Sequence, residues 1–223
     1  KKIYDIERLI GKISYGNANA RDMISLKNSI KQLPELKHLL EQANSSILKN
    51  AYEELDELTD IYELINKAVI DDPPVTLKEG GIIKLGYNSM VDTYRKATTE
   101  GKQWVINIEQ KEKETTGIKN LKIGYNKVFG YFLEVTKSYL NLVPDRYIRK
   151  QTLTNCERYI TEELKDVENK ILGAEEKVVS LEYDLFIELR NKIASQIERI
   201  QKSANIVSTL DVLCSFAQVA EEL

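Results

Sequence analysis

Two long stretches of the chain carry apolar side chains at alternating intervals of three and four residues. The first pattern passes through Tyr87, Val91, Tyr94, Thr98, Gly101, Val105 and Ile108. The second passes through Leu164, Val167, Ile171, Ala174, Val178, Leu181 and Leu185, then shifts register to Leu189, Ile193 and Ile197. This is the heptad spacing of helices that pack against a partner helix. It predicts an antiparallel pair of long helices, over residues 88–115 and 161–200, with Asn88 and Thr161 as N-caps.

Between these two stretches the pattern changes to strict alternation. Residues 121–126, 131–136 and 147–152 alternate and are rich in β-branched and aromatic side chains, which is typical of β-strands. Residues 126–129, followed by Gly130, predict a hairpin turn, because Asn and Gly adopt the backbone angles that tight turns need. The segment therefore predicts a small antiparallel sheet at the tip of the paired helices.

The flanking sequence predicts a helical body. Apolar residues at helical spacing indicate helices over residues 3–15, 20–33, 47–58 and 59–69, with a short helix that begins near Pro34. Residues 75–85 predict a short hairpin or an extended turn. A last helix is expected over residues 203–223, with Ile206, Val207, Leu210, Leu213 and Phe216 facing the body. The predicted fold class is thus mainly α: a helical body with two long antiparallel lever helices that carry a small antiparallel β-sheet clamp at their tip.

Thr98 and Gly101 form a weak centre in the first heptad pattern. A glycine inside a helix costs about 1 kcal/mol relative to alanine. Gly101 either permits close approach of the partner helix or marks a junction between two segments. The junction is the favoured interpretation, with Trp104 packing beside it.

The predicted tip is basic although the chain is acidic. Residues 101–160 contain eleven basic and six acidic side chains, a net charge of +5, whereas the whole chain has a net charge of −3 and the remainder therefore −8. A basic region on an acidic protein indicates a local contact with a polyanion. Asn, Gln, Thr and Tyr between the charges can also donate to phosphate oxygens. A solvated surface whose lysines only maintain solubility remains the alternative.

Motifs of catalysis are missing from the sequence. It contains no GxxxxGK[ST] phosphate loop, no HExxH, no CxxC and no GxSxG. Cys156 and Cys214 are too few for a metal quartet, and His38, the single histidine, fits an exposed helix position. No uninterrupted apolar run approaches the ~18 residues of a membrane span. Both ends look cut, so we expect a fragment of a longer protein. Because the motifs above are missing, we expect this chain to have no enzymatic activity, metal or cofactor of its own.

Several runs resemble the MutS family of DNA mismatch repair proteins. They are GYNKVFGYFLEVTK, VPDRYIRKQTLTNCERYITEELK, KILGAEEK, QLPELK, IDDPP and EGGIIKLGYN, and together they extend over essentially the whole chain. The resemblance implies a core (lever) domain in residues 1–100 and 161–223 and an inserted clamp domain in residues 101–160. It implies that the clamp grips the backbone of double-stranded DNA, matched or mismatched, and that the lever helices couple it to an ATPase domain.

The resemblance also implies partners and a location. ATP and Mg²⁺ are expected only in a full-length protein, as are a homodimer and a MutL-type partner. The implied location is the bacterial cytoplasm, in association with the nucleoid and not with a membrane. The residues predicted to contact the DNA backbone are Asn126, Lys127, Arg149, Lys150, Thr152, Asn155 and Arg158.

A structural coiled-coil module whose β tip binds a protein partner is the alternative function. Dimerisation through the arms, or a tip indifferent to DNA, would favour that alternative.

Overall fold

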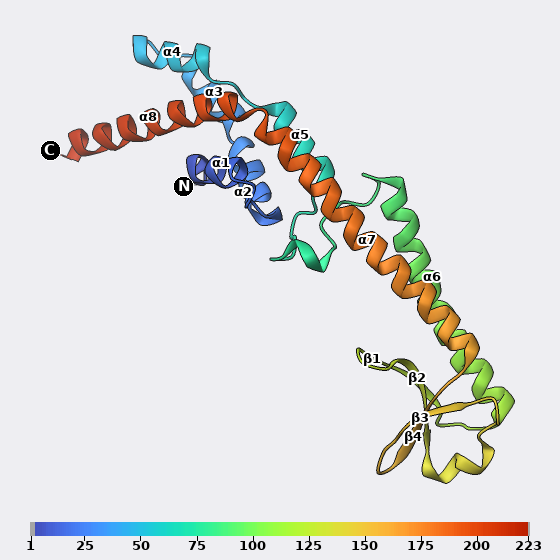
Figure 1. Cartoon of the computed structure of the whole chain (residues 1–223). Helices are drawn as coiled ribbons and strands as arrows, with labels where there is room; N and C mark the ends of the chain where they lie inside the picture. Colours follow the sequence, from blue (N-terminus) through green and yellow to red (C-terminus); the bar gives the residue numbers. More distant parts are fainter. Residues whose placement is uncertain (1–2, 223) are drawn as a thin grey trace. The chain divides into compact units, whose positions relative to one another are not determined.

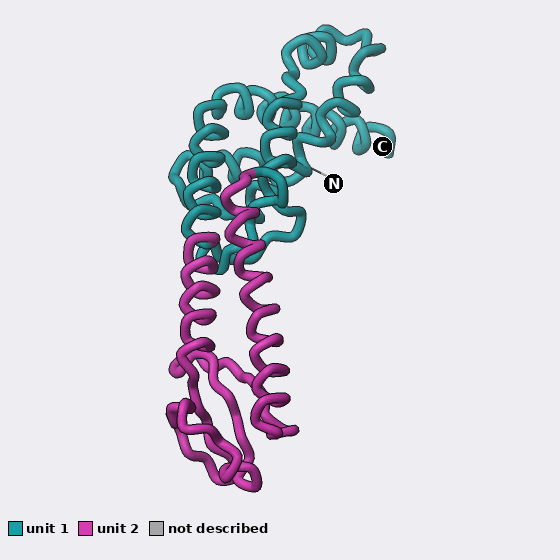
Figure 2. Tube along the Cα trace, turned by 90° about the vertical axis from the view of Figure 1, so that its right-hand side faces the viewer, with its two compact units in different colours: residues 1–87, 179–223 teal, residues 88–178 magenta. Residues whose placement is uncertain are grey.

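The computed structural model describes residues 3–222 and divides them into two compact units, which are described separately below. One unit comprises residues 1–87 and 179–223, and the other comprises residues 88–178 (Figure 2). The described chain is mainly helical with one four-stranded antiparallel sheet (Figure 1), which confirms the predicted fold class. The predicted domain boundaries at residues 100 and 160 come from the family resemblance and not from the division into compact units, so they remain a prediction.

The discontinuous unit is built from short helices, the last part of one long helix and a second long helix in full. Its helices are α1 (Ile6–Ser14), α2 (Ala20–Ile30), α3 (Leu33–Leu40), α4 (Ser46–Glu54), α5 (Thr59–Ala68), the 3-10 turn η1 (Leu77–Glu79), the last part of α7 (Glu162–Ala194) and α8 (Ile197–Glu222). The N-terminal segment contributes Leu9, Met23 and Ile65 to the core, and the C-terminal segment contributes Phe186 and Ile193. The core of this unit therefore requires both segments of the chain.

Local capping explains where several of these helices begin. The Asp5 carboxylate accepts a hydrogen bond from the Arg8 amide at 2.9 Å and caps α1. Asn19 and Asp22 form a reciprocal capping box at the start of α2. Residues 75–85 form η1 and an extended segment with one isolated bridge between Val69 and Ile83, so the extended turn is the correct alternative there.

Helix α8 differs from the expected last helix in its start and in its exposure. It begins at Ile197, directly after a turn at residues 195–196. Leu210 is buried, but Phe216 is 69% exposed, so the expectation that Phe216 faces the body is wrong. By length and composition alone α8 could cross a bilayer, and it is the one such helix in residues 3–222. Lys202 interrupts its apolar sequence and pairs with Glu54 at 3.4 Å.

The continuous unit consists of a helix pair and a sheet. Its elements are α6 (Ser89–Thr116), β1 (Lys122–Asn126), β2 (Gly130–Thr136), the 3-10 segment η2 (Lys137–Leu142), β3 (Ile148–Thr152), β4 (Cys156–Ile160) and the first part of α7. Helix α6 and this part of α7 lie side by side and antiparallel, with the sheet following the end of α6 (Figures 1 and 2). Asn88 caps α6 as predicted, and the Thr161 hydroxyl accepts from the Leu164 amide at the start of α7.

The predicted heptad pattern packs the two helices of this unit together. From α6 the buried positions are Val91, Gly101, Val105 and Ile108, and from α7 they are Leu164, Val167, Ile171 and Ala174. Beyond Ala174 the predicted positions Val178, Leu181 and Leu185 are only half-buried. Leu189 and Ile193, which the predicted register shift includes, are buried together with Glu182 and Phe186. Helix α6 runs without interruption through Gly101, so the favoured junction is wrong and close approach of the partner helix is correct.

Candidate nucleic-acid interface

The sheet has the strand order β1-β2-β4-β3, and every neighbouring pair is antiparallel. The turn at residues 126–130 connects β1 to β2 as predicted, and Gly130 takes a positive φ of 75° there. The Asn126 side chain accepts a hydrogen bond from the Val128 amide at 2.8 Å and shapes this turn. Strand β4 was missed by the sequence reading, because Cys156, Glu157 and Arg158 interrupt the apolar alternation that identified the other strands.

One face of the sheet packs on the core of the continuous unit. Leu133, Val135 and Tyr159 are buried there together with Val105 and Leu164 from the helices. Because successive side chains of a strand point to opposite faces, their neighbours Phe132, Glu134 and Arg158 point to the other face. The sheet thus has a core face and an outer face.

A β-bulge in β3 decides which face each predicted residue occupies. Arg149 pairs with Tyr159, but Gln151 pairs with Arg158, so Lys150 is the extra residue. Arg149 and Thr152 therefore belong to the core face, where Arg149 is exposed at its edge. Arg158 belongs to the outer face.

The two turns lie at opposite ends of the sheet. Strand β2 begins at Gly130 and ends at Thr136, and Thr136 pairs with Cys156 at the start of β4. Lys127 is therefore at one end and Asn155 at the other. The structure does not bring the seven predicted residues together: they are distributed over two faces, one edge and both ends.

The arginines of the sheet are held by carboxylates. Arg158 donates to Glu134 at 3.0 Å and to Gln151 at 3.0 Å, and its guanidinium lies 4.2 Å from the centre of the Phe132 ring. Arg149 makes a looser ion pair with Glu157 at 3.6 Å, and its side chain is 64% exposed. Arg158 thus braces the outer face, whereas Arg149 can leave its partner at little cost.

The lysines of the sheet region are exposed and make no ion pair within the described residues. They are Lys119, Lys122, Lys127, Lys137 and Lys150. Lys119, Lys122 and Lys137 were not among the predicted contacts, although all three were counted in the basic excess of residues 101–160. Their position beside turns was the available signal in the sequence.

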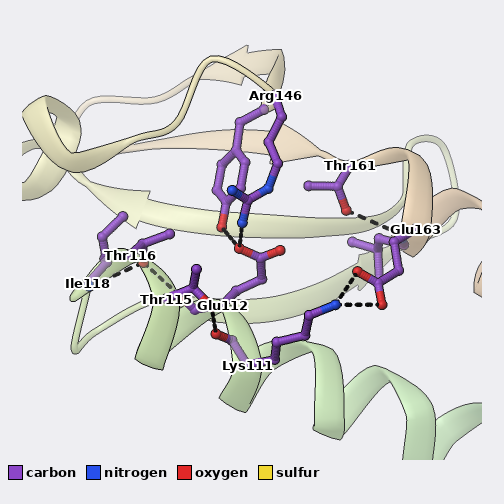
Figure 3. Close-up of polar contacts among 10 residues, drawn as sticks. Lys111, Glu112, Thr115, Thr116, Ile118, Arg146, Thr161 and Glu163 are labelled. Carbon is purple, nitrogen blue, oxygen red and sulfur yellow. Dashed lines mark hydrogen bonds and ion pairs between the residues drawn. The ribbon is translucent and has the colours of Figure 1, made fainter.

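Buried polar contacts attach the sheet to α6 (Figure 3). The Glu112 carboxylate is 2% exposed; it accepts from the Tyr147 hydroxyl at 2.7 Å and pairs with Arg146 at 2.5 Å. Two causes raise the pKa of the Tyr147 hydroxyl well above its usual value: burial, which is the larger, and this hydrogen bond. Lys111 reaches across to Glu163 at the start of α7.

A second attachment uses Glu109. Its carboxylate accepts from the Ile123 amide at 2.8 Å and from Lys113 at 2.6 Å. Burial raises the pKa of Glu109, but these hydrogen bonds and the Lys113 charge outweigh burial, so that the pKa lies below its usual value. In β4, burial and a hydrogen bond to Glu157 raise the pKa of Tyr159 to about 12.

No group of three or more His, Cys, Asp or Glu side chains within residues 3–222 is arranged to hold a metal ion. Both cysteines are free thiols. Burial and the neighbouring Glu134 raise the pKa of the Cys156 thiol, which lowers the thiolate fraction near neutral pH. The chemistry available on this sheet is therefore charge and hydrogen bonding.

These features define a class of protein: a helical protein in which two antiparallel helices carry a small inserted antiparallel sheet with a lysine-rich surface. A family model described as "MutS family domain IV" matches residues 86–177, which nearly coincide with the continuous unit. The chain belongs to the MutS family of DNA mismatch repair proteins.

Curated relatives match nearly the whole chain. The DNA mismatch repair protein MutS of Acetivibrio thermocellus is 57% identical over 221 residues, which is 99% of this chain and 25% of the relative. The MutS protein of Alkaliphilus oremlandii is 55% identical over 222 residues, 100% of this chain and 25% of the relative. The MutS protein of Caldanaerobacter subterraneus subsp. tengcongensis is 59% identical over 220 residues, which is 99% of this chain and 25% of the relative. The chain therefore spans about a quarter of the length of these relatives.

Proposed function

We propose that the sheet of the continuous unit grips the sugar–phosphate backbone of duplex DNA without reading its sequence. The observation that carries this proposal is the difference between Arg158, which is held by Glu134, and the exposed lysines of the small sheet, which have no ion pair within the described residues. Lysine is a flexible point charge that binds phosphate without fixed geometry. Contacts to phosphates supply affinity but carry no sequence information directly.

The seven predicted residues have different roles in this proposal. Lys127, Lys150 and Arg149 supply charge, and Thr152 and Asn155 supply neutral donors; all five are exposed. Asn126 shapes the β1–β2 turn that presents Lys127. Arg158 positions the outer face through Glu134 and Gln151 and reaches phosphate only by releasing them.

The proposal extends to the full-length protein by family membership. There the helices couple the sheet to an ATPase domain that uses ATP and Mg²⁺, in a homodimer that works with a MutL-type partner in the bacterial cytoplasm, at the nucleoid. The present chain alone binds no ATP and hydrolyses none. A malachite-green phosphate assay tests this: turnover that persists through purification and disappears on mutation of this chain contradicts it.

A salt titration of DNA binding tests the grip. Three or four cations give a slope of log K against log salt of roughly −3 to −4, with a Kd on the order of 10⁻⁴ M near physiological salt. Matched and G·T-containing duplexes of equal length are expected to titrate alike in fluorescence anisotropy. Lys150→Glu lowers both affinities equally and flattens the slope by about one or two. Preference for the mismatched duplex, or binding that ignores salt, contradicts the proposal.

One observation favours a second candidate, a tip that binds protein. The β1–β2 turn exposes Val128 (80%), Phe129 (46%) and Tyr125 (50%). Dimerisation through the heptad seam has no support, because that seam is buried between α6 and α7 of one chain. Two results together would favour this candidate: Lys150→Glu leaves DNA binding unchanged, and Val128→Asp loses binding to a protein partner.

A further inference from the structure

The end of the sheet at which β2 finishes and β4 begins gathers polar side chains from three segments. Asn120, in the turn before β1, donates to the Thr136 hydroxyl at 2.6 Å. The Thr136 and Ser138 hydroxyls lie 3.1 Å apart. The Lys137 amide donates to the Asn155 carbonyl oxygen at 3.1 Å, which joins β2 to the β3–β4 turn. We call this group the distal end: Lys119, Asn120, Thr136, Lys137, Ser138 and Asn155.

The distal end is positive and rich in donors. Lys119 and Lys137 are exposed and have no ion pair within residues 3–222. The Asn155 side chain is exposed as well, with no hydrogen bond to the part of the chain that the structure describes. Ser138 shares one contact with Thr136 and keeps capacity for another, because a hydroxyl both donates and accepts. Two cations with hydroxyl and amide donors between them match the needs of a phosphodiester oxygen.

The opposite end of the sheet has a different electrostatic environment. There the Glu168 carboxylate of α7 occupies the space that a Cβ on Gly130 would fill, directly beside the β1–β2 turn. Glu168 has no ion pair within the described residues, so its charge opposes the approach of phosphate to Lys127. The carboxylates of the strands near the distal end, Glu134 and Glu157, are instead paired with Arg158 and Arg149.

We propose that the distal end is the main phosphate-binding site of the sheet and that Lys119 and Lys137 carry most of its salt-dependent affinity for duplex DNA. The site rests on the proposed function and names residues beyond the predicted set. Ser138 and Asn155 add neutral hydrogen bonds there. Lys127 and Lys150 contribute less, because they lie at the other end and on the β3 edge.

Charge reversal in the whole 223-residue chain tests this assignment. Lys119→Glu and Lys137→Glu are each expected to weaken binding of a fluorescein-labelled duplex about tenfold at 0.1 M salt, and the double variant to flatten the salt slope by about two. Ser138→Ala and Asn155→Ala are expected to weaken binding a few-fold at unchanged slope, because they remove no charge. Lys49→Glu is the matched control: Lys49 is exposed on α4, outside this unit, and has no ion pair within residues 3–222. Circular dichroism verifies the fold of each variant.

The outcomes separate the site from the function. Loss of affinity in the distal variants, with Lys49→Glu like the parent, supports the site. If the distal variants bind like the parent and Lys127→Glu or Lys150→Glu loses affinity, the assignment of the site is wrong. The proposed function then still holds. A parent chain that binds no duplex even at low salt overturns both.

Discussion

Gly101 of α6 packs directly against Ile171 of α7, so closely that a Cβ on Gly101 would overlap Cγ1 of the isoleucine. Both residues are buried in the seam between the two helices. The glycine that weakens α6 as an isolated helix is therefore the residue that lets the two backbones approach. Local helix propensity and packing between helices have opposite preferences at this position.

Gly101→Ala is expected to destabilise the protein by about 1–3 kcal/mol, because overpacking at Ile171 exceeds the gain in helix propensity. Gly173→Ala is the matched control, since a Cβ there meets nothing within 4 Å and α7 gains about 1 kcal/mol or less. Urea denaturation followed by circular dichroism measures both. Equal stabilisation by the two substitutions would contradict the close approach.

Glu112→Ala is expected to lower the free energy of unfolding by about 1–3 kcal/mol. The change leaves the buried Tyr147 hydroxyl without its acceptor and Arg146 without its partner. Glu114→Ala is the control, because Glu114 is exposed on the same helix and bonds only Gln110 among the described residues. An effect of equal size in both variants would show that the loss comes from the helix and not from the attachment of the sheet.

Acid pH is expected to loosen the attachment of β1 to α6. The pKa of Glu109 is lower in the folded chain than its usual value of 4.5, so its contribution to stability is complete above about pH 4.5 and is lost as the pH falls through the folded-state pKa. Glu109→Gln should therefore destabilise the chain at neutral pH and reduce the slope of stability against pH in the acid range. Denaturation series between neutral pH and pH 3 check this. If the variant shows the same slope of stability against pH as the parent, Glu109 is not the cause of the acid sensitivity.

Arg158 and Lys150 should separate stability from DNA affinity. Arg158→Gln breaks contacts with Glu134 and Gln151 and is expected to destabilise the sheet by about 1–2 kcal/mol. Lys150→Gln removes an exposed charge that has no ion pair among the described residues. It is expected to change stability by less than about 0.5 kcal/mol while weakening DNA binding. Thermal melting together with anisotropy titration measures both quantities. A stable Arg158→Gln chain with strongly reduced affinity would return Arg158 to the group of direct contacts.

Periodicity was sufficient to predict the helix pair, because burial in the seam leaves its spacing in the sequence from Val91 to Ile108 and from Leu164 to Ala174. It was insufficient between Ala174 and Leu189, where the predicted positions are only half-buried and the buried position Glu182 is charged. The carboxylate of Glu182 accepts from the Ile82 amide at 2.7 Å, and a partner so distant in sequence has no local signal.

The candidate site was predictable in kind and not in detail. The excess of basic residues marked the right segment. Residue type alone could not distinguish Arg158, which is held by Glu134, from Lys137, which has no ion pair in the described part of the chain. The bulge at Lys150 also moves Gln151 and Thr152 to faces that simple alternation does not predict.

The division into one continuous and one interrupted unit has a consequence for synthesis at the ribosome. Residues 88–178 are contiguous, so every residue of that unit has been synthesised once α7 is half made. The first 87 residues must wait, because Phe186 and Ile193, which complete their core, are translated after residue 178. Nascent chains arrested when residue 178 has just left the ribosomal exit tunnel should hold a protease-resistant second unit and a protease-sensitive first one. The order of maturation along the polypeptide is then the reverse of the order of translation.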